Sequence, residues 1–435
     1  MQTQNTPNEP ISYDGRVGQL YKIFFLNIIL GIITLGIYHF WGKTRYRRYE
    51  TSSFSLLKDR FEYTGYGGEL FWGFIKAIVI LGILSIPLFW SLVLFDDISD
   101  QLKDIEKSTK AAAVEIAPHQ GTAPNAAPNA TAPTAAGVGE THETNPIDKL
   151  SPEDQDTFYT ALWIIIGYWL FYAIYIPFVA VYGSLRYRAS RTRWRGIRGH
   201  MTGSSIIYGF VGLWHLFWKV VTLSLWLPFG DAMLFKYKMK RLTFGNQPAE
   251  FTPQYGTLFW SHISTLLVTA VLTSVVFALC VAYVLHLNAV SAIPNDVHVI
   301  FEKIAQAINH DVHNKSILVF IPLLSLIIIG FISRFWYRAT LVRVQYNNLH
   351  FGNLGFRCRI GGFALFRQQL GNFFILLLTL RLATPWVTQR RQRFFCKNVQ
   401  VTGEVDKAAI GQAVGEKDKW GEGVSSAFDI NIGLF

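Results

Sequence analysis

The sequence predicts an all-α integral membrane protein, a multi-pass helical bundle with internal repeats and short β-like linkers on the cytoplasmic side. Three observations support this class. The mean hydropathy is +0.25, while only 16% of the 435 residues are charged. Several apolar runs exceed the roughly 18 residues that suggest a bilayer span. The basic residues, which give a formal net charge of +11, cluster just beyond these runs, where the positive-inside bias places them, and this favours membrane topology over nucleic-acid binding.

Hydropathy predicts about seven apolar segments separated by polar linkers. They cover approximately residues 20–42, 69–95, 158–185, 206–235, 257–286, 316–337 and 363–388. The stretch 96–157 is rich in Ala, Pro and Thr with acidic flanks, and we expect a disordered extramembrane insert there. Residues 1–14 form a polar N-terminal tail without the features of a cleaved signal peptide, and residues 406–435 form a flexible C-terminal tail.

The apolar segments recur along the chain, which indicates an internal repeat. The stretch beginning "LYKIFFLNIILG" at Leu20 aligns without a gap with "LFRQQLGNFFIL" at Leu365. The matched pairs are Lys22/Arg367, Asn27/Asn372, Thr34/Thr379, Leu35/Leu380, Trp41/Trp386, Arg45/Arg390 and Arg48/Arg393. The Leu and Thr matches are weak because these residues are common in membrane helices. The fourth segment aligns as a degenerate third copy, with His215 opposite Lys22.

The remaining segments follow the same order. The second and fifth share "YGGELFW" and "YGTLFW", and the third and sixth both end in Tyr-Arg-Ala, at Tyr187 and Tyr337. Writing the three segment types as X, Y and Z, the order is X-Y-Z, X-Y-Z, X. This predicts a first membrane repeat over residues 15–205, a second over 206–362 and a partial third over 363–405.

The charge distribution does not decide whether the X segments cross the membrane or re-enter it. The basic linkers 43–60, 186–198, 236–241, 334–359 and 390–397 belong in the cytoplasm, and the loops 96–157 and 287–315 belong outside. The middle and last X segments each begin and end beside a basic linker. Either X re-enters as a hairpin or broken helix, with Pro228 near the break, or X is an ordinary span where the bias fails. The first X, 20–42, is apolar enough to span alone.

The basic linkers contain short strand-like runs that close on glycine. Examples are "RFEYTG" at Arg60, "RLTFGN" at Arg241, "NLHFGN" at Asn348, "FRCRIGG" at Phe356 and "VQVTGEV" at Val399. Such runs predict short strands that pair as small hairpins at the cytoplasmic face, because unpaired strands cannot lie in lipid. Unstructured interfacial loops are the alternative.

Three stretches carry a family resemblance. These are "TLGIYHFWGKTRYRRY" from Thr34, the following "FEYTGYGGELFWGF" and "YRASRTRWRGIRG" from Tyr187. They resemble the YjgN family of bacterial inner-membrane proteins over about residues 11–405, the 96–157 insert excepted. The resemblance implies a multi-pass location in the bacterial cell inner membrane. The family is of unknown function, so the resemblance supplies no site residues, and Pro228 and Asp231 depart from its repeated pattern.

Ionisable residues inside the X segments are the first candidate site, because a charge at membrane depth suggests function. The substrate-binding candidates are His215, Lys219, Asp231 and Arg381. A hairpin could pair Lys219 with Asp231; the alternative is a structural ion pair or snorkelling at the interface. A second set faces anionic lipid or another anion, with topology determination as the alternative. Its members are Arg186, Arg188, Arg191, Arg193, Arg195 and Arg338.

No enzyme signature is present. The P-loop, the Gly-x-Ser-x-Gly elbow and the His-Glu-x-x-His motif are missing, and three scattered cysteines suggest no disulfide framework. A "HDVH" run offers one edge of a metal site, among His286, Asp296, His298, His310, Asp311 and His313, but a solvated loop is the simpler interpretation. We expect no catalysis, cofactor, metal or nucleic-acid partner.

These features favour a transporter or channel-like protein for an anionic small solute or lipid. The alternative is a non-transporting membrane scaffold that binds anionic lipid or a protein partner through its Arg-rich cytoplasmic linkers.

Overall fold

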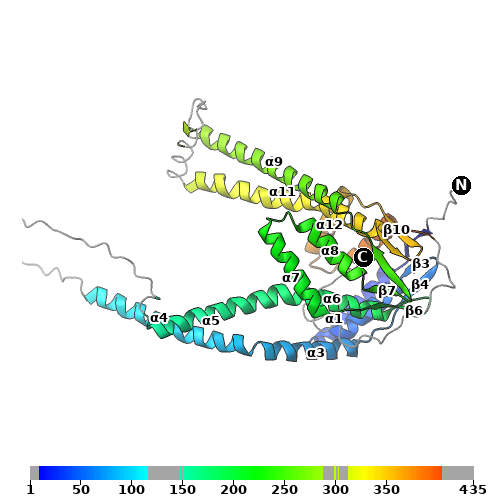
Figure 1. Ribbon diagram of the computed structural model, residues 1–435, viewed down its shortest axis with the longest axis horizontal. Coiled ribbons are helices and arrows are strands. Elements are labelled where there is room, and N and C mark those ends of the chain that lie inside the picture. The colour runs from blue at the N-terminus through cyan, green and yellow to red at the C-terminus, as the bar shows by residue number, and fades with distance from the viewer. Residues whose placement is uncertain are drawn as a thin grey trace, which may run out of the picture. The chain divides into compact units, whose positions relative to one another are not determined.

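The computed structural model describes residues 9–115, 147, 150–287, 298–299, 302 and 312–403 (Figure 1). The chain divides into two compact units, one made of Lys76–Ile176 and the other of the residues before and after it. Both are mainly helical, and the larger one also contains an eleven-stranded sheet.

Four described helices are long and apolar enough to cross a membrane, as hydropathy predicted for this class. The first is α3 (Gly67–Leu84). The second is a continuous run of α5 (Pro152–Leu170), the π-helical η2 (Phe171–Tyr175) and α6 (Ile176–Arg191). The third and fourth lie within α9 (Tyr255–Leu287) and α11 (Val312–Asn347).

The predicted insert is shorter than expected, because both of its acidic flanks are helical. Helix α4 (Ile86–Glu115) continues well past residue 96, and Ser151 caps the start of α5 by accepting the Asp154 N–H at 3.2 Å. Asp100 and Lys103 form an i,i+3 ion pair on α4, and Phe95 stacks on Phe158 at 5.1 Å. Local ion pairs and this aromatic contact support helix where composition suggested disorder. The Ala/Pro/Thr-rich centre and the C-terminal tail lie outside the described residues.

The three predicted X segments are each a pair of short helices rather than one. The pairs are α1 (Val17–Ile33) with α2 (His39–Ser52), α7 (Ser205–Val221) with α8 (Leu227–Met239), and α12 (Gly362–Leu378) with α13 (Thr384–Asn398). The first X segment, 20–42, is apolar enough to span alone by composition, but it too is divided between two helices. Pro228 does lie near the break, which spans residues 222–226; it stands in the first turn of α8, where its fixed φ and missing N–H suit a helix start.

The strand-like runs of the linkers form β-hairpins. They are β3 (Phe54–Leu56) with β4 (Asp59–Tyr63), β5 (Thr192–Trp194) with β6 (Ile197–Met201), β7 (Leu242–Phe244) with β8 (Gln247–Phe251), and β9 (Leu349–Phe351) with β10 (Leu354–Cys358). The two-residue turns contain positive φ, at Leu57 and Lys58 in the first hairpin and at Gly245 and Gly352 in the last two. Such turns match the twist of the strands they join.

These hairpins join into one sheet that closes on itself. Residues 9–13 form β1 (Glu9–Pro10) and β2 (Ser12–Tyr13); β1 pairs with β11 (Val399–Thr402) and β2 pairs with β3. The remaining strands pair in chain order from β3 to β11. The expectation that residues 1–14 form a polar tail is therefore wrong for residues 9–13. Their pairing partners lie too far along the chain to leave a local sequence signal.

A hydrogen bond at the same place in each hairpin ties neighbouring hairpins together. The residue after the second strand donates its N–H to the carbonyl of the residue before the next hairpin. The pairs are Asp14 to Ser53, Thr64 to Arg191, Thr202 to Arg241, Thr252 to Asn348 and Arg359 to Asn398, at 2.8–3.3 Å. In this comparison β11 and residues 9–13 together take the place of a hairpin, although they come from opposite ends of the chain.

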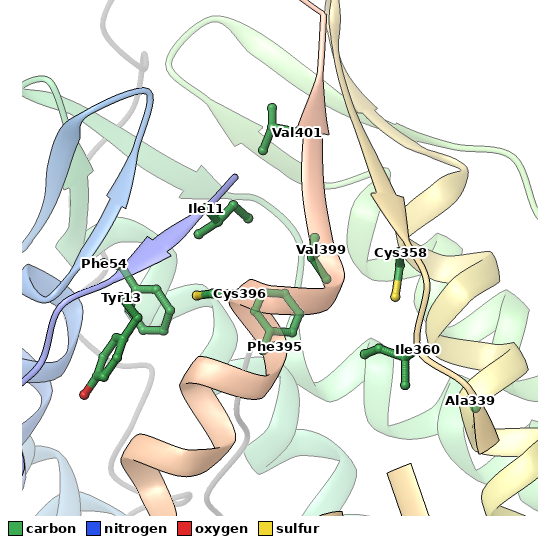
Figure 2. Packing of buried hydrophobic residues seen from close by; sticks show 10 residues of the cluster. All are labelled: Ile11, Tyr13, Phe54, Ala339, Cys358, Ile360, Phe395, Cys396, Val399 and Val401. Atoms are coloured by element: carbon green, nitrogen blue, oxygen red, sulfur yellow. The ribbon is translucent and has the colours of Figure 1, made fainter. Parts of the chain in front are cut away.

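A hydrophobic cluster lies where these two ends meet (Figure 2). Ile11, between β1 and β2, belongs to the same cluster as Val399 and Val401 of β11, and Tyr13 of β2 lies beside Phe54. Phe395 and Cys396 at the end of α13 complete the cluster. Val399 is fully buried. Burial raises the pKa of the Cys396 thiol to about 11, so this cysteine is a packing residue and not a reactive thiolate.

Candidate functional site

The turns of the three short helical hairpins are built alike around a threonine. Thr34, Thr222 and Thr379 each donate a side-chain hydrogen bond to the carbonyl four residues earlier, at 2.6–2.7 Å. The same Oγ1 atoms accept the backbone N–H groups of Tyr38, Trp226 and Ala383, at 2.9–3.2 Å. The two residues after each threonine have positive φ. The hydroxyl thus satisfies an N–H that the reversal of the chain would leave unpaired.

We expect Thr222→Val to destabilise the α7–α8 hairpin by about 1–2 kcal/mol, because the Trp226 N–H loses its acceptor. Thr222→Ser is the matched control, since it keeps the hydroxyl. The measurement is the free energy of unfolding of the purified protein in bicelles. Equal stability of the two variants would show that the hydroxyl contributes nothing.

These turns also correct the alignment of the middle copy. The sequence comparison placed His215 opposite Lys22. Counting back from the turn threonines, His215 instead stands opposite Asn27 and Asn372. Asn27 donates Nδ2 to the Gly42 carbonyl at 3.1 Å, and His215 accepts the Trp226 indole N–H at 3.2 Å. In both hairpins the side chain seven residues before the turn threonine therefore links the first helix to the second helix, or to the residue just before it.

The α7–α8 hairpin contains an ion pair between the two residues that sequence analysis singled out. Lys219 Nζ lies 2.8 Å from Asp231 Oδ1, with the two side chains 23% and 25% exposed. The second carboxylate oxygen, Oδ2, accepts the Tyr337 hydroxyl of α11 at 3.1 Å. Asp231 therefore joins the two arms of the hairpin to a candidate membrane span.

A histidine that sequence analysis did not select completes this group. His262 of α9 has Nε2 3.1 Å from the Ser224 carbonyl in the turn, and its ring packs edge-on against Tyr337 at 5.3 Å between centroids. Lys219, Asp231, Tyr337 and His262 are called the hairpin cluster below. His262 has no counterpart in the first Y segment, and Tyr337 had been noted only as a mark of the repeat. The one sequence signal for His262 was that it is a polar ring within an apolar span.

The hairpin cluster links the α7–α8 hairpin to α9 and α11, and its ion pair could open to leave Lys219 free to bind an anion. Its cation and carboxylate neutralise each other, so an anion that reaches Lys219 must displace Asp231. Tyr337 and His262 each add one hydrogen bond to the apolar packing of α8 against α9 and α11. A displacement of the hairpin that exposes the ion pair would therefore break both hydrogen bonds and disturb this packing.

Arg381 does not belong to this cluster. It lies exposed in the turn between α12 and α13, at the position that Ser224 occupies between α7 and α8. The α12–α13 hairpin packs against α11 through its first helix, and α13 contacts α1. The two candidate cations, Lys219 and Arg381, therefore belong to different hairpins.

Most of the predicted lipid-facing arginines serve the fold. Arg191, which is buried, pairs with Glu69 at 2.9 Å, and the Tyr187 hydroxyl donates to the other oxygen of the same carboxylate at 2.8 Å. Arg195 pairs with Asp59 and covers the Trp194 ring at 4.5 Å. Arg186 donates to the Gly203 carbonyl at 2.7 Å, and Arg188 also has intramolecular contacts. Arg193 is half-buried and Arg338 is exposed.

The sheet decides how the short hairpins run. Strands β6 and β7 are hydrogen-bonded partners, and they lie on either side of the α7–α8 hairpin in the chain. Likewise, β2 pairs with β3 across α1–α2, and β10 pairs with β11 across α12–α13. Paired strands must lie on the same side of a membrane. Each short hairpin therefore begins and ends at the same sheet.

The residues that the structure describes contain no group of three or more metal-binding side chains. Asp296, His310 and Asp311 of the "HDVH" region lie outside those residues.

Comparison with known proteins gives one family and one curated relative. The model of a family described as bacterial protein of unknown function, DUF898, matches residues 8–427. The inner membrane protein YjgN of Salmonella typhimurium (strain LT2) is 31% identical over 86 residues. This match covers 20% of the chain and only 22% of the relative's length. No solved structure matches.

Proposed function

Because this chain belongs to the DUF898 family of bacterial proteins, we propose that it works in the bacterial inner membrane as a transporter or channel-like protein for an anionic small solute or lipid. The name of the curated relative supports the location, and the four candidate spans support an integral protein. The proposal includes no chemical reaction, cofactor or nucleic-acid partner.

The hairpin cluster is the observation that carries the proposal. An ionisable pair inside a membrane protein is costly to bury, and it marks a functional site by default. Here the pair lies in a hairpin that enters and leaves on one side, an arrangement that secondary transporters use around their binding sites. In the proposed cycle an anion binds Lys219 as the ion pair opens, and the hairpin moves away from Tyr337 and His262.

We also propose that the recurring elements are copies of one ancestral unit. In this view the seven apolar segments of the sequence comprise four spans and three short hairpins, in the order X-Y-Z, X-Y-Z, X. The shared threonine turns and the recurring hydrogen bonds between β-hairpins support this proposal. The equivalent positions in the three X units then carry Lys43, Asp231 and Thr388, so the middle copy differs in charge and is the proposed site.

The test is flux through proteoliposomes loaded with chloride or inorganic phosphate, together with flipping of a fluorescent anionic lipid. We expect Lys219→Ala to reduce flux at least about tenfold, since a lost charged contact is worth about 1.4 kcal/mol or more. Lys240→Ala is the matched control, because Lys240 is exposed near the end of the same hairpin. Arg381→Ala asks whether a second turn contributes to the path.

Removal of Lys219 leaves Asp231 unpaired, so each variant is first checked for a monodisperse, folded state. The double variant Lys219→Met, Asp231→Leu removes both charges and keeps the fold testable. Normal flux in Lys219→Ala and Arg381→Ala, or a folded wild-type protein that moves neither anion nor lipid, would contradict the proposal.

The scaffold alternative predicts binding to anionic liposomes that weakens as salt rises. Arg338 is an exposed member of the predicted set, and Arg338→Ala is the test of such a role. Binding that is absent, or insensitive to salt, would remove this alternative.

A further inference from the structure

The turns of the three short hairpins present large apolar side chains outward. Leu35, Leu223 and Leu380, which each follow the turn threonine, are 93%, 86% and 84% exposed. They are the apolar side chains furthest from burial in their hairpins, and the residues just before each turn continue the apolar surface. These neighbours are Ile32, Ile33, Val220, Val221 and Leu378, all more than half exposed. A soluble turn normally carries polar residues at such positions.

The backbone of each turn needs no water. The N–H groups of residues 223–227 all donate within their own hairpin, at 2.7–3.0 Å. Residues 35–39 and 380–384 repeat the pattern at 2.7–3.3 Å. Four donors in each turn use backbone carbonyls and the fifth uses the threonine hydroxyl. A turn in water gains little from such completeness, but a turn in hydrocarbon requires it, because an unpaired N–H there costs several kcal/mol.

Contacts with the spans set the depth of two of the turns. The Ser224 carbonyl meets His262, seven residues into α9, and Phe40 beside the first turn packs on Phe74, seven residues into α3, at 4.9 Å. At 1.5 Å rise per residue this is about 10 Å from the sheet end of each span. Half of a hydrocarbon core is about 15 Å. With the hydrocarbon surface placed at the first residue of each span, the turns reach into the leaflet nearer the sheet and stop short of the bilayer midplane.

Arg381 fits the same depth. Its guanidinium is carried by an exposed turn residue, and an arginine about 10 Å below the surface can extend its charge back to the headgroups. The same residue at the midplane would be far more costly.

We propose that the three turns insert into the hydrocarbon of a single leaflet, the one next to the sheet, and that acyl chains are the partner of their exposed leucines. The three turns would then add cross-sectional area to that leaflet. This inference rests on the turns and not on the hairpin cluster, so it does not depend on transport.

The test places a spin label at Leu35, Leu223 or Leu380 after replacement of Cys280, Cys358 and Cys396, in the full chain reconstituted into phosphatidylethanolamine and phosphatidylglycerol liposomes. Collision rates with oxygen and with a water-soluble nickel chelate report depth. Two positions serve as controls. Asn246, at the tip of the β7–β8 hairpin, reports water, and Leu267, exposed twelve residues into α9, reports the bilayer centre.

We expect the oxygen-to-nickel ratio at all three turns to exceed that at Asn246 about tenfold and to stay below that at Leu267. Nickel access equal to that at Asn246 would place the turns in water and overturn the proposal. A ratio equal to that at Leu267 would place them at the midplane and overturn the single-leaflet claim. Spin–spin broadening that vanishes on dilution with unlabelled protein would assign the turns to contact with a second copy. If a label disturbs folding, Ile33, Val221 and Leu382 give a second set of positions in the same three turns.

Discussion

Replacing Ile11 with Asp should open the closed sheet and destabilise the larger unit by about 4 kcal/mol or more. Ile11 is 8% exposed in the cluster where the first strand meets β11. The substitution removes a packed side chain, which costs about 2–5 kcal/mol in a core, and adds a carboxylate with no cation in the cluster. The measurement is the free energy of unfolding, with Ile11→Val as the control for a loss of about 1 kcal/mol.

A crosslink tests the closure itself. In the cysteine-free protein, cysteines at Pro10 and Gln400 should form a disulfide on mild oxidation, because these residues are paired across β1 and β11. A cysteine pair at Pro10 and Arg357 is the matched control. Arg357 pairs with Gln400 on its other side, so a whole strand separates it from Pro10. Crosslinking of both pairs, or of neither, would show that the ends do not meet as described.

Removing the Glu69 carboxylate should be the second severe change. Glu69 is the ion-pair partner of Arg191, whose side chain is only 7% exposed, and it accepts the Tyr187 hydroxyl. Glu69→Ala leaves a buried guanidinium without this charge, and breaking a buried pair in this way costs about 3–5 kcal/mol. Because the Glu69 side chain is 35% exposed, we expect the lower end of that range.

The matched control for Glu69→Ala is Tyr187→Phe, which removes one hydrogen bond and should cost about 1 kcal/mol. Thermal unfolding of the two variants, measured side by side in the same detergent, separates the contributions. A Glu69→Ala protein as stable as Tyr187→Phe would mean that Arg191 finds other compensation, and that the pair does not hold the start of α3 to the end of α6.

The membrane class and much of the linker structure could be predicted from the sequence. Long apolar runs predict the spans directly. Runs such as "RLTFGN" predict strands, because their residue types and glycine turns are local signals. The reversal inside each X segment was harder to see. Thr34 and Thr379 did align, but threonine is common in membrane helices, and nothing in the sequence shows that its hydroxyl caps a turn.

The candidate site was half predictable. Lys219 and Asp231 stand out as charges in an apolar segment, and charge bias had already suggested a hairpin that could pair them. Tyr337 and His262 join them only through packing of α8 against α11 and α9, which no local pattern encodes. The arginines were predicted to face lipid, but most of them serve the fold. A basic run looks the same in the sequence whether its members face lipid or, like Arg191, turn inward to a carboxylate.

The closure of the sheet by residues 9–13 also bears on how the protein is made. The first strand leaves the ribosome early, while its partner β11 follows nearly four hundred residues later. Until β11 has been translated, Ile11 and Tyr13 cannot pack into a complete core. Every hairpin made in between must therefore insert before the sheet has closed. Such long-range pairing makes the last step of assembly slow. Residues 9–13 would therefore depend on chaperones or the insertion machinery until β11 is made.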